Sequence, residues 1–257
     1  MKKSVLFMVC LLLVVSVSAA CGKKPENTNS NAVSSNTSSE SEPLNPEYAG
    51  YSDIIDRLLS EYGEGRIATV TDADGNVKEN GLCGLSVVRL LDFDGDGTYE
   101  MYVAVGAQSE DPSVLSVPSK QCFYGFRDGK AYLITDSIPV SKGELDVSPF
   151  AQFFITNGKT YYHYRNSWSG AVYTLENGAM TAVLTYDYDP WEQTETGSNI
   201  NGVPKTSEEI DEALKAYSSG GQNDIIYLYP EPESGNSERL NSVLSETGEA
   251  ISAIKGE

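Results

Sequence analysis

The sequence predicts an α+β fold that is mainly β, an antiparallel meander of about nine strands with helices near its N- and C-terminal ends. Short segments of alternating apolar and polar residues fill the middle of the chain, and helical periodicity is confined to the ends. Turn pairs of one type separate successive strands: Asp128-Gly129, Asn157-Gly158 and Asn177-Gly178. Such pairs favour two-residue hairpin turns, because type I′ turns need positive φ at both central residues.

The helices are predicted from their caps and apolar faces. Ser52 is the expected N-cap of a helix that runs to Tyr62 and stops at Gly63. A second helix begins after Thr206, which has capping-box spacing to Glu209. Residues 237–254 form the third, although Gly248 weakens its pattern. The expected strands are 85–91, 99–105, 121–127, 130–135, 152–156, 159–164, 171–176, 179–186 and 224–229.

The chain divides by composition into three parts. Residues 1–20 contain a basic start and an apolar run that is too short to span a bilayer, which is typical of an export signal. Residues 21–46 are rich in Ser, Asn and Thr and are expected to be a disordered tether. Residues 47–257 have the length and apolar content of a single β-rich domain.

The end of the export signal, 16-SVSAAC-21, resembles the lipobox of bacterial lipoproteins, with Ser18 where that family usually has Leu. The resemblance implies cleavage before Cys21, a diacylglycerol group on its sulfur, and an extracytoplasmic domain anchored to the cell membrane. An ordinary secreted protein with a chance cysteine is the alternative.

The charge and the cysteines restrict the partners and the cross-links. A formal net charge of −19 excludes nucleic acid and anionic lipid surfaces as favourable partners. Cys83 and Cys122 lie inside the expected domain, as either a disulfide or two buried thiols. If their strands flank a common strand, they lie about 9–10 Å apart, beyond bridging distance.

One acidic segment, 90-LLDFDGDGTYEMYV-103, has the pattern of a calcium loop. Such loops place side-chain oxygens at positions one, three, five and nine, a glycine at six and a backbone carbonyl at seven. Oxygen ligands of this kind suit calcium. The alternative is that these acids extend into solvent and the glycines only make a turn. The expected ligands in positions one, three, five, seven and nine are Asp92, Asp94, Asp96, Thr98 and Glu100.

An EF-hand is excluded because its twelfth position needs a bidentate glutamate and this chain has Val103. The segment instead resembles the DxDxDG loops found between strands in FG-GAP repeats and related calcium modules. That resemblance implies direct coordination by the three aspartates, by the Thr98 carbonyl, and by Glu100 directly or through water. Since the loop joins two apolar strands, we expect a structural ion that fixes a hairpin.

A wider resemblance covers 81-GLCGLSVVRLLDFDGDGTYEMYVAV-105 and 200-INGVPKTSEEIDEALKAY-217. These segments are similar to those of uncharacterised surface lipoproteins of Gram-positive anaerobes. The similarity implies a cell-surface location and no established activity.

An enzyme is the less favoured hypothesis, because no catalytic set is recognisable. The single histidine, His163, lies in an alternating strand, and the one SxxK match, Ser252 to Lys255, lacks the partner motifs of that family. The alternative to a binding role is an extracytoplasmic, glycan-acting hydrolase with acidic catalytic residues. A cavity that gathers two acids away from 92–100 would favour it.

The binding hypothesis rests on aromatic residues, whose flat apolar faces and polar edges suit glycans or protein partners. Alternation places Tyr162 and Tyr164 on one face of a strand and Tyr161 and His163 on the other. The alternative is that one face is core and the other an ordinary half-exposed sheet. The candidate ligand-binding aromatics are Tyr161, Tyr162, Tyr164, Trp168 and Trp191.

Overall fold

The computed structural model describes residues 46–72, 74–109, 116–141, 150–166, 168–188, 197–219, 221–228 and 238–257, without the side chains of 46–48. The expected signal peptide, Cys21, nearly all of the expected tether and Trp191 therefore lie outside the described residues. The chain divides into two units, Met1–Glu40 and Ser41–Glu257, and every described residue belongs to the second.

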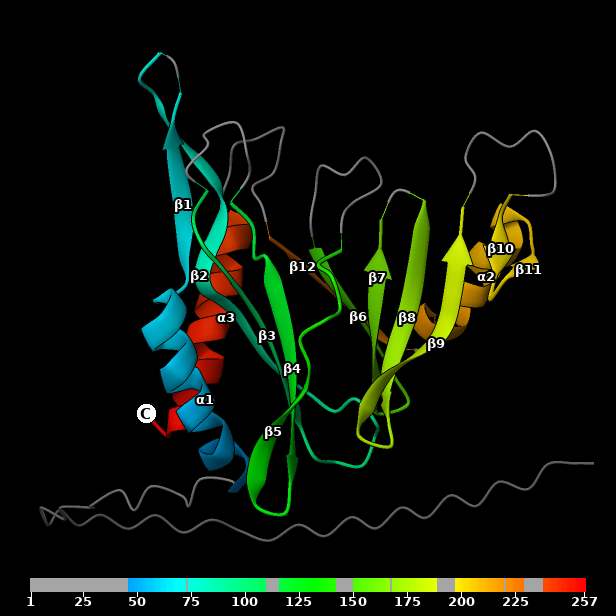
Figure 1. Ribbon diagram of the computed structural model, residues 1–257, viewed down its shortest axis with the longest axis horizontal. Coiled ribbons are helices and arrows are strands. Elements are labelled where there is room, and N and C mark those ends of the chain that lie inside the picture. Colours follow the sequence, from blue (N-terminus) through cyan, green and yellow to red (C-terminus); the bar gives the residue numbers. More distant parts are fainter. Residues whose placement is uncertain are drawn as a thin grey trace, which may run out of the picture. The chain divides into compact units, whose positions relative to one another are not determined.

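The described residues form two antiparallel sheets (Figure 1). The first has five strands in chain order: β1 (Arg66–Thr71), β2 (Val77–Leu91), β3 (Glu100–Gly106), β4 (Lys120–Arg127) and β5 (Lys130–Thr135). The second has the order β11-β10-β9-β8-β7-β6-β12. Its strands are β6 (Phe150–Thr156), β7 (Lys159–Arg165), β8 (Ser169–Glu176), β9 (Ala179–Asp187), β10 (Asn199–Ile200), β11 (Val203–Pro204) and β12 (Gln222–Tyr227).

The predicted α+β, mainly β class is confirmed, and all nine expected strands are present. The predicted hairpin turns are also confirmed, since Asp128, Asn157 and Asn177 and the glycines after them all have positive φ. Asn201-Gly202 makes a fourth turn of this kind, between β10 and β11. The strands β1, β10 and β11 were not predicted from the sequence. The nine predicted strands are divided between two sheets, with the boundary between β5 and β6.

Three helices accompany the sheets: α1 (Pro46–Tyr62), α2 (Ser207–Ser218) and α3 (Glu238–Lys255). The capping box of α2 is confirmed, because Thr206 and Glu209 each accept a hydrogen bond from the other's backbone N–H. The prediction that Ser52 caps the first helix is wrong, since α1 already begins at Pro46. None of the described helices is long and apolar enough to cross a membrane.

Side chains that alternate along the strands form three apolar clusters, one between the two sheets and one on the outer face of each sheet. The cluster between the two sheets includes Tyr102 of β3 and Phe153 of β6. On its outer face, the first sheet packs against α1 and α3. On its outer face, the second sheet packs against Ile210 of α2. Figure 1 shows α1 and α3 side by side against the first sheet, with α2 beside the second.

The cysteines remain apart. Cys83 lies on β2 and Cys122 on β4, and β3 separates these strands. Both are free, buried thiols, so the disulfide that the sequence left open is not formed in this structure. Burial raises the pKa of both thiols, which reduces their reactivity.

Gly248 provides a test of the packing of α3. A Cβ atom at this mid-helix position would meet no heavy atom within 4 Å. We expect Gly248→Ala to stabilise the domain by about 0.5–1 kcal/mol, because alanine loses less backbone entropy in a helix interior. Urea unfolding of the Ser41–Glu257 unit measures the change.

Gly84→Ala is the matched control. Gly84 has φ +79°, and a Cβ there would lie 2.1 Å from the carbonyl oxygen of Glu64. This substitution should destabilise the same unit. Equal effects of the two substitutions would contradict the packing of α3 described here.

Candidate metal centre

The acidic loop connects β2 to β3, and its own backbone shapes it. The two carboxylate oxygens of Asp92 accept hydrogen bonds from the N–H groups of Gly95, at 2.7 Å, and Gly97, at 3.0 Å. Gly95 and Gly97 have φ of +80° and +88°, a conformation that side chains with a Cβ rarely adopt. The backbone of the loop therefore folds around the carboxylate of Asp92.

Three of the five expected ligands come together. One carboxylate oxygen from each of Asp92, Asp94 and Glu100 lies within 4.8 Å of the other two. Two oxygens on opposite sides of one calcium ion lie about 4.6–5.2 Å apart, since each Ca–O distance is about 2.3–2.6 Å. The three oxygens are therefore close enough together to hold one metal ion.

Of the other two expected ligands, Asp96 is not part of this group. Asp96 is exposed, and its Oδ1 accepts a hydrogen bond from the N–H of Thr98 at 2.7 Å. The carbonyl oxygen of Thr98 stays a predicted ligand. The candidate metal-binding carboxylates of the described residues are those of Asp92, Asp94 and Glu100.

The electrostatics of the loop depend on Glu100, which is only 4% exposed. Burial raises the pKa of Glu100 to about 7, although the hydrogen bond from the N–H of Phe93, at 2.9 Å, favours its charged form. Partial desolvation, followed by the charge of Asp96, raises the pKa of Asp94. Without a cation, ionised carboxylates at this spacing repel one another by ~1–3 kcal/mol per pair.

The loop also contacts the second sheet. The carbonyl of Asp92 accepts a hydrogen bond from the N–H of Thr160 on β7, at 2.9 Å. The carbonyl of Phe93 accepts one from the hydroxyl of Thr174 on β8, also at 2.9 Å. Sequence analysis missed both threonines, because the contacts join residues 68 and 81 positions apart and no local pattern marks them.

The side chain of Phe93 strengthens this connection. It is fully buried between the sheets and makes edge contacts with Phe123, at 5.6 Å, and Phe153, at 6.1 Å between ring centroids. Phe93 lies between two of the candidate ligands, Asp92 and Asp94. The position of the acidic loop is therefore linked to the packing of the two sheets.

The candidate ligand-binding aromatics do not form one exposed face. Tyr162 is fully buried between the sheets, and half-buried Tyr164 packs against the same cluster. Tyr161 lies on the opposite face of β7, against Tyr217 of α2. Trp168 is 48% exposed and is the one described member of the set that is largely open to solvent. Alternation along β7 is thus as predicted, and most of these rings serve the core.

His163 belongs to the layer under α2. Its Nδ1–H donates to the Gln152 side-chain oxygen, at 2.6 Å, and its Nε2 accepts from the Tyr186 hydroxyl, at 2.7 Å. Burial, followed by the charge of Arg165, lowers the pKa of His163 to about 3. A neutral, buried imidazole with both nitrogens engaged is a structural group, as alternation along the strand favoured.

Comparisons of the chain with protein-family models, with curated proteins and with solved structures found no significant match.

The single histidine makes the environment of His163 measurable. Since its folded pKa is below the ordinary value, its contribution to stability is present above about pH 6.5 and is lost as the pH falls toward 3. We expect the Cε1–H resonance of the Ser41–Glu257 unit to stay constant in NMR spectra between pH 8 and about pH 5. The same resonance in denaturant should titrate near the ordinary value, and native titration near that value would contradict the burial of this ring.

Proposed function

We propose that this protein is a lipid-anchored, extracytoplasmic binding domain in which a calcium ion, held by loop 92–100, stabilises the junction of the two sheets. The observation that carries the calcium proposal is the convergence of carboxylate oxygens from Asp92, Asp94 and Glu100 within 4.8 Å of one another. Hard oxygen donors without nitrogen or sulfur favour calcium over zinc or copper.

The surroundings of the loop support a structural role for the ion. The carbonyls of Asp92 and Phe93 bond to the second sheet, whereas the carboxylates of Asp92 and Glu100 belong to the candidate site. A cation at this place offsets the repulsion among the acids and holds the loop against both sheets. A catalytic ion would need acid–base groups nearby, and the described histidine is buried under α2, with its nitrogens engaged by Gln152 and Tyr186.

The location is proposed from the N-terminal sequence. A basic start, an apolar run and small residues before Cys21 are the parts of a lipoprotein signal. Residues 21–46 have the composition of a tether that would hold the domain away from the membrane surface. Calcium is available outside the cytoplasm at concentrations that suit weak sites of this kind.

Calcium binding is tested by thermal unfolding of the Ser41–Glu257 unit with calcium and with chelator. A ligand at a hundred times its dissociation constant stabilises by about 2.7 kcal/mol, which raises the Tm of a domain of this size by about 5–10 °C. An unchanged Tm at millimolar calcium would defeat the proposal.

Two substitutions and a matched control locate the site. Asp94→Asn and Glu100→Gln should each reduce the calcium-dependent rise in Tm, and Glu100→Gln should raise the Tm in chelator because it removes a buried charge. Asp128→Asn removes the same charge from a hairpin turn at φ 54°, which Asn also adopts, and should leave the rise intact.

Anchoring is tested in a Gram-positive host with the full chain. The unmodified protein should partition into the detergent phase of a Triton X-114 extract, and Cys21→Ala should move it to the aqueous phase, because the substitution removes the sulfur that carries the lipid. Cys10→Ala, within the apolar run, is the control and should keep the protein in the detergent phase. An unmodified protein found in the aqueous phase and the medium would contradict the anchor.

A further inference from the structure

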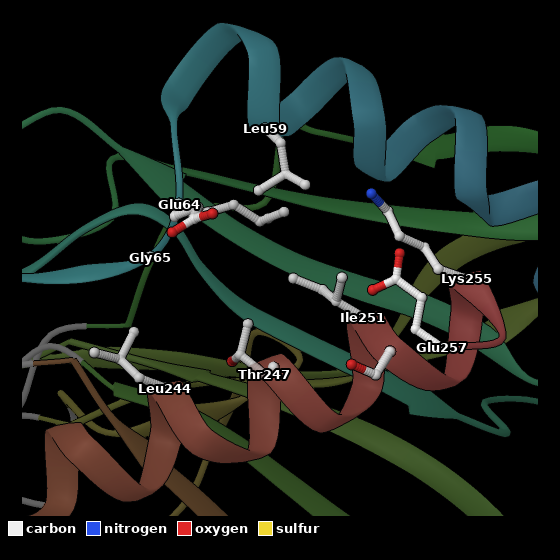
Figure 2. A pocket seen from close by; sticks show the side chains of 11 residues that line it. Leu59, Glu64, Gly65, Leu244, Thr247, Ile251, Lys255 and Glu257 are labelled. Carbon is white, nitrogen blue, oxygen red and sulfur yellow. The ribbon is translucent and has the colours of Figure 1, made fainter.

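A cavity of about 340 Å³ lies between α1, α3 and β2, on the outer face of the first sheet (Figure 2). Its volume is within the range of small-molecule sites. Leu85 of β2, Leu59 of α1 and Leu244 and Ile251 of α3 supply its apolar surface. No residue of loop 92–100 lines it, so an inference from this cavity is independent of the calcium proposal.

One face of α3 forms a wall of the cavity, and Gly248 leaves that face open. Leu244, Gly248, Ile251 and Lys255 recur at intervals of three or four residues, so they share a face. Gly248 lies in the middle of this wall, where an added Cβ would meet nothing within 4 Å. A glycine in a helix interior is unfavourable for stability, and no contact of the described residues requires one here. Its absent side chain contributes to the space.

The charged groups of the cavity leave an excess of negative charge. Figure 2 shows Glu257 beside Lys255 at one end of the space and Glu64 at the other, with Ile251 between them. The ammonium of Lys255 is bonded to Asp56 at 2.6 Å. Within the described part of the chain, neither Glu64 nor Glu257 forms an ion pair. A cationic ligand would compensate these carboxylates.

We propose that this cavity binds a small apolar molecule that carries a primary ammonium group. The apolar body would lie against Leu59, Leu244 and Ile251, and the ammonium would pair with Glu64 or Glu257. An uncharged ligand would leave both carboxylates unpaired, and an anionic ligand would be repelled by them. This inference gives the proposed binding role a ligand class.

The cavity favours binding over catalysis. It does gather two acids outside loop 92–100, which is what a hydrolase would need. However, Glu64 and Glu257 are both exposed and lie at opposite ends of the space, whereas a general acid is usually kept protonated by burial. Ser252 and Lys255, the SxxK pair, also line the cavity, but the hydrogen bond to Asp56 raises the pKa of Lys255 and keeps its amine protonated. It cannot serve as the base that activates a serine.

The test is an NMR titration of the Ser41–Glu257 unit with three probes of equal chain length: hexylamine, hexan-1-ol and hexanoate. Hexylamine should bind with a dissociation constant on the order of 1 mM and shift resonances of α1 and α3. Hexan-1-ol should bind about tenfold more weakly, because it lacks the charge that pairs with a carboxylate. Hexanoate should bind more weakly still. Equal affinity for the amine and either other probe, or no shift with the amine, would overturn the proposal.

Variants locate the binding. Gly248→Leu should fill the space and abolish the shifts, whereas Asp128→Asn, in a hairpin turn outside the cavity, should keep the affinity within about threefold. The double variant Glu64→Gln/Glu257→Gln should bind hexylamine at least about tenfold more weakly. Retention of full affinity in Gly248→Leu would place the ligand elsewhere and overturn the proposal.

Each titration is performed in calcium and in chelator. Loss of amine binding in both, with the calcium-dependent Tm rise retained, would defeat this inference alone. Amine binding without any effect of calcium on Tm would defeat the calcium proposal alone.

Discussion

Two sheets that share no strand are held together by a layer of aromatic side chains. Phe93, Tyr102, Phe123, Phe153 and Tyr162 contact one another there, with ring centroids 5.0–6.3 Å apart. Because their edges and faces interlock, the layer fixes how the sheets sit on each other. The helices pack onto the outer faces of these two sheets, and α3 also contributes Leu240 and Val243 to the cluster between them.

Polar side chains inside the same layer form hydrogen bonds, which depend on direction as apolar contacts do not. Tyr102 of β3 donates to the Gln121 side-chain oxygen at 2.9 Å, and the Gln121 amide donates to the Tyr162 hydroxyl on β7 at 3.0 Å. The hydrogen bond between Gln121 and Tyr162 joins the two sheets and is made only when these residues face each other across the layer. The acidic loop joins this arrangement at its edge through Phe93, which explains how a surface site and a buried core become parts of one unit.

Much of this architecture follows from local sequence. The Asp-Gly and Asn-Gly pairs determine the hairpins because only a few residues tolerate positive φ, and Thr206 and Glu209 mark the start of α2 through their own hydrogen bonds. Asp92, Asp94 and Glu100 were identified from spacing, because a coiled loop directs alternate residues to its centre. Asp96 was expected among them, but its carboxylate, which accepts a hydrogen bond from the N–H of Thr98, is not one of the three that converge.

What the sequence could not provide depends on contacts between distant residues. The division into two sheets arises from packing of the inner faces, and no sequence pattern between residues 135 and 150 predicts it. Thr160 and Thr174 gain their roles only once β7 and β8 lie against the loop. The cavity combines Leu59 and Glu64 with residues of α3. Gly248, which is an unfavourable residue in a helix interior, was the only local feature of the sequence that related to this cavity.

The placement of α3 bears on the order in which a newly made chain can fold. Leu240 and Val243 of α3 belong to the inter-sheet cluster, and the Thr247 hydroxyl donates to the carbonyl of Ser86, 161 residues earlier. The part of β2 that packs against α3 thus stays uncovered until α3 has been synthesised. For a protein exported as proposed above, a domain that needs α3 to complete its packing would fold after the whole chain has crossed the membrane.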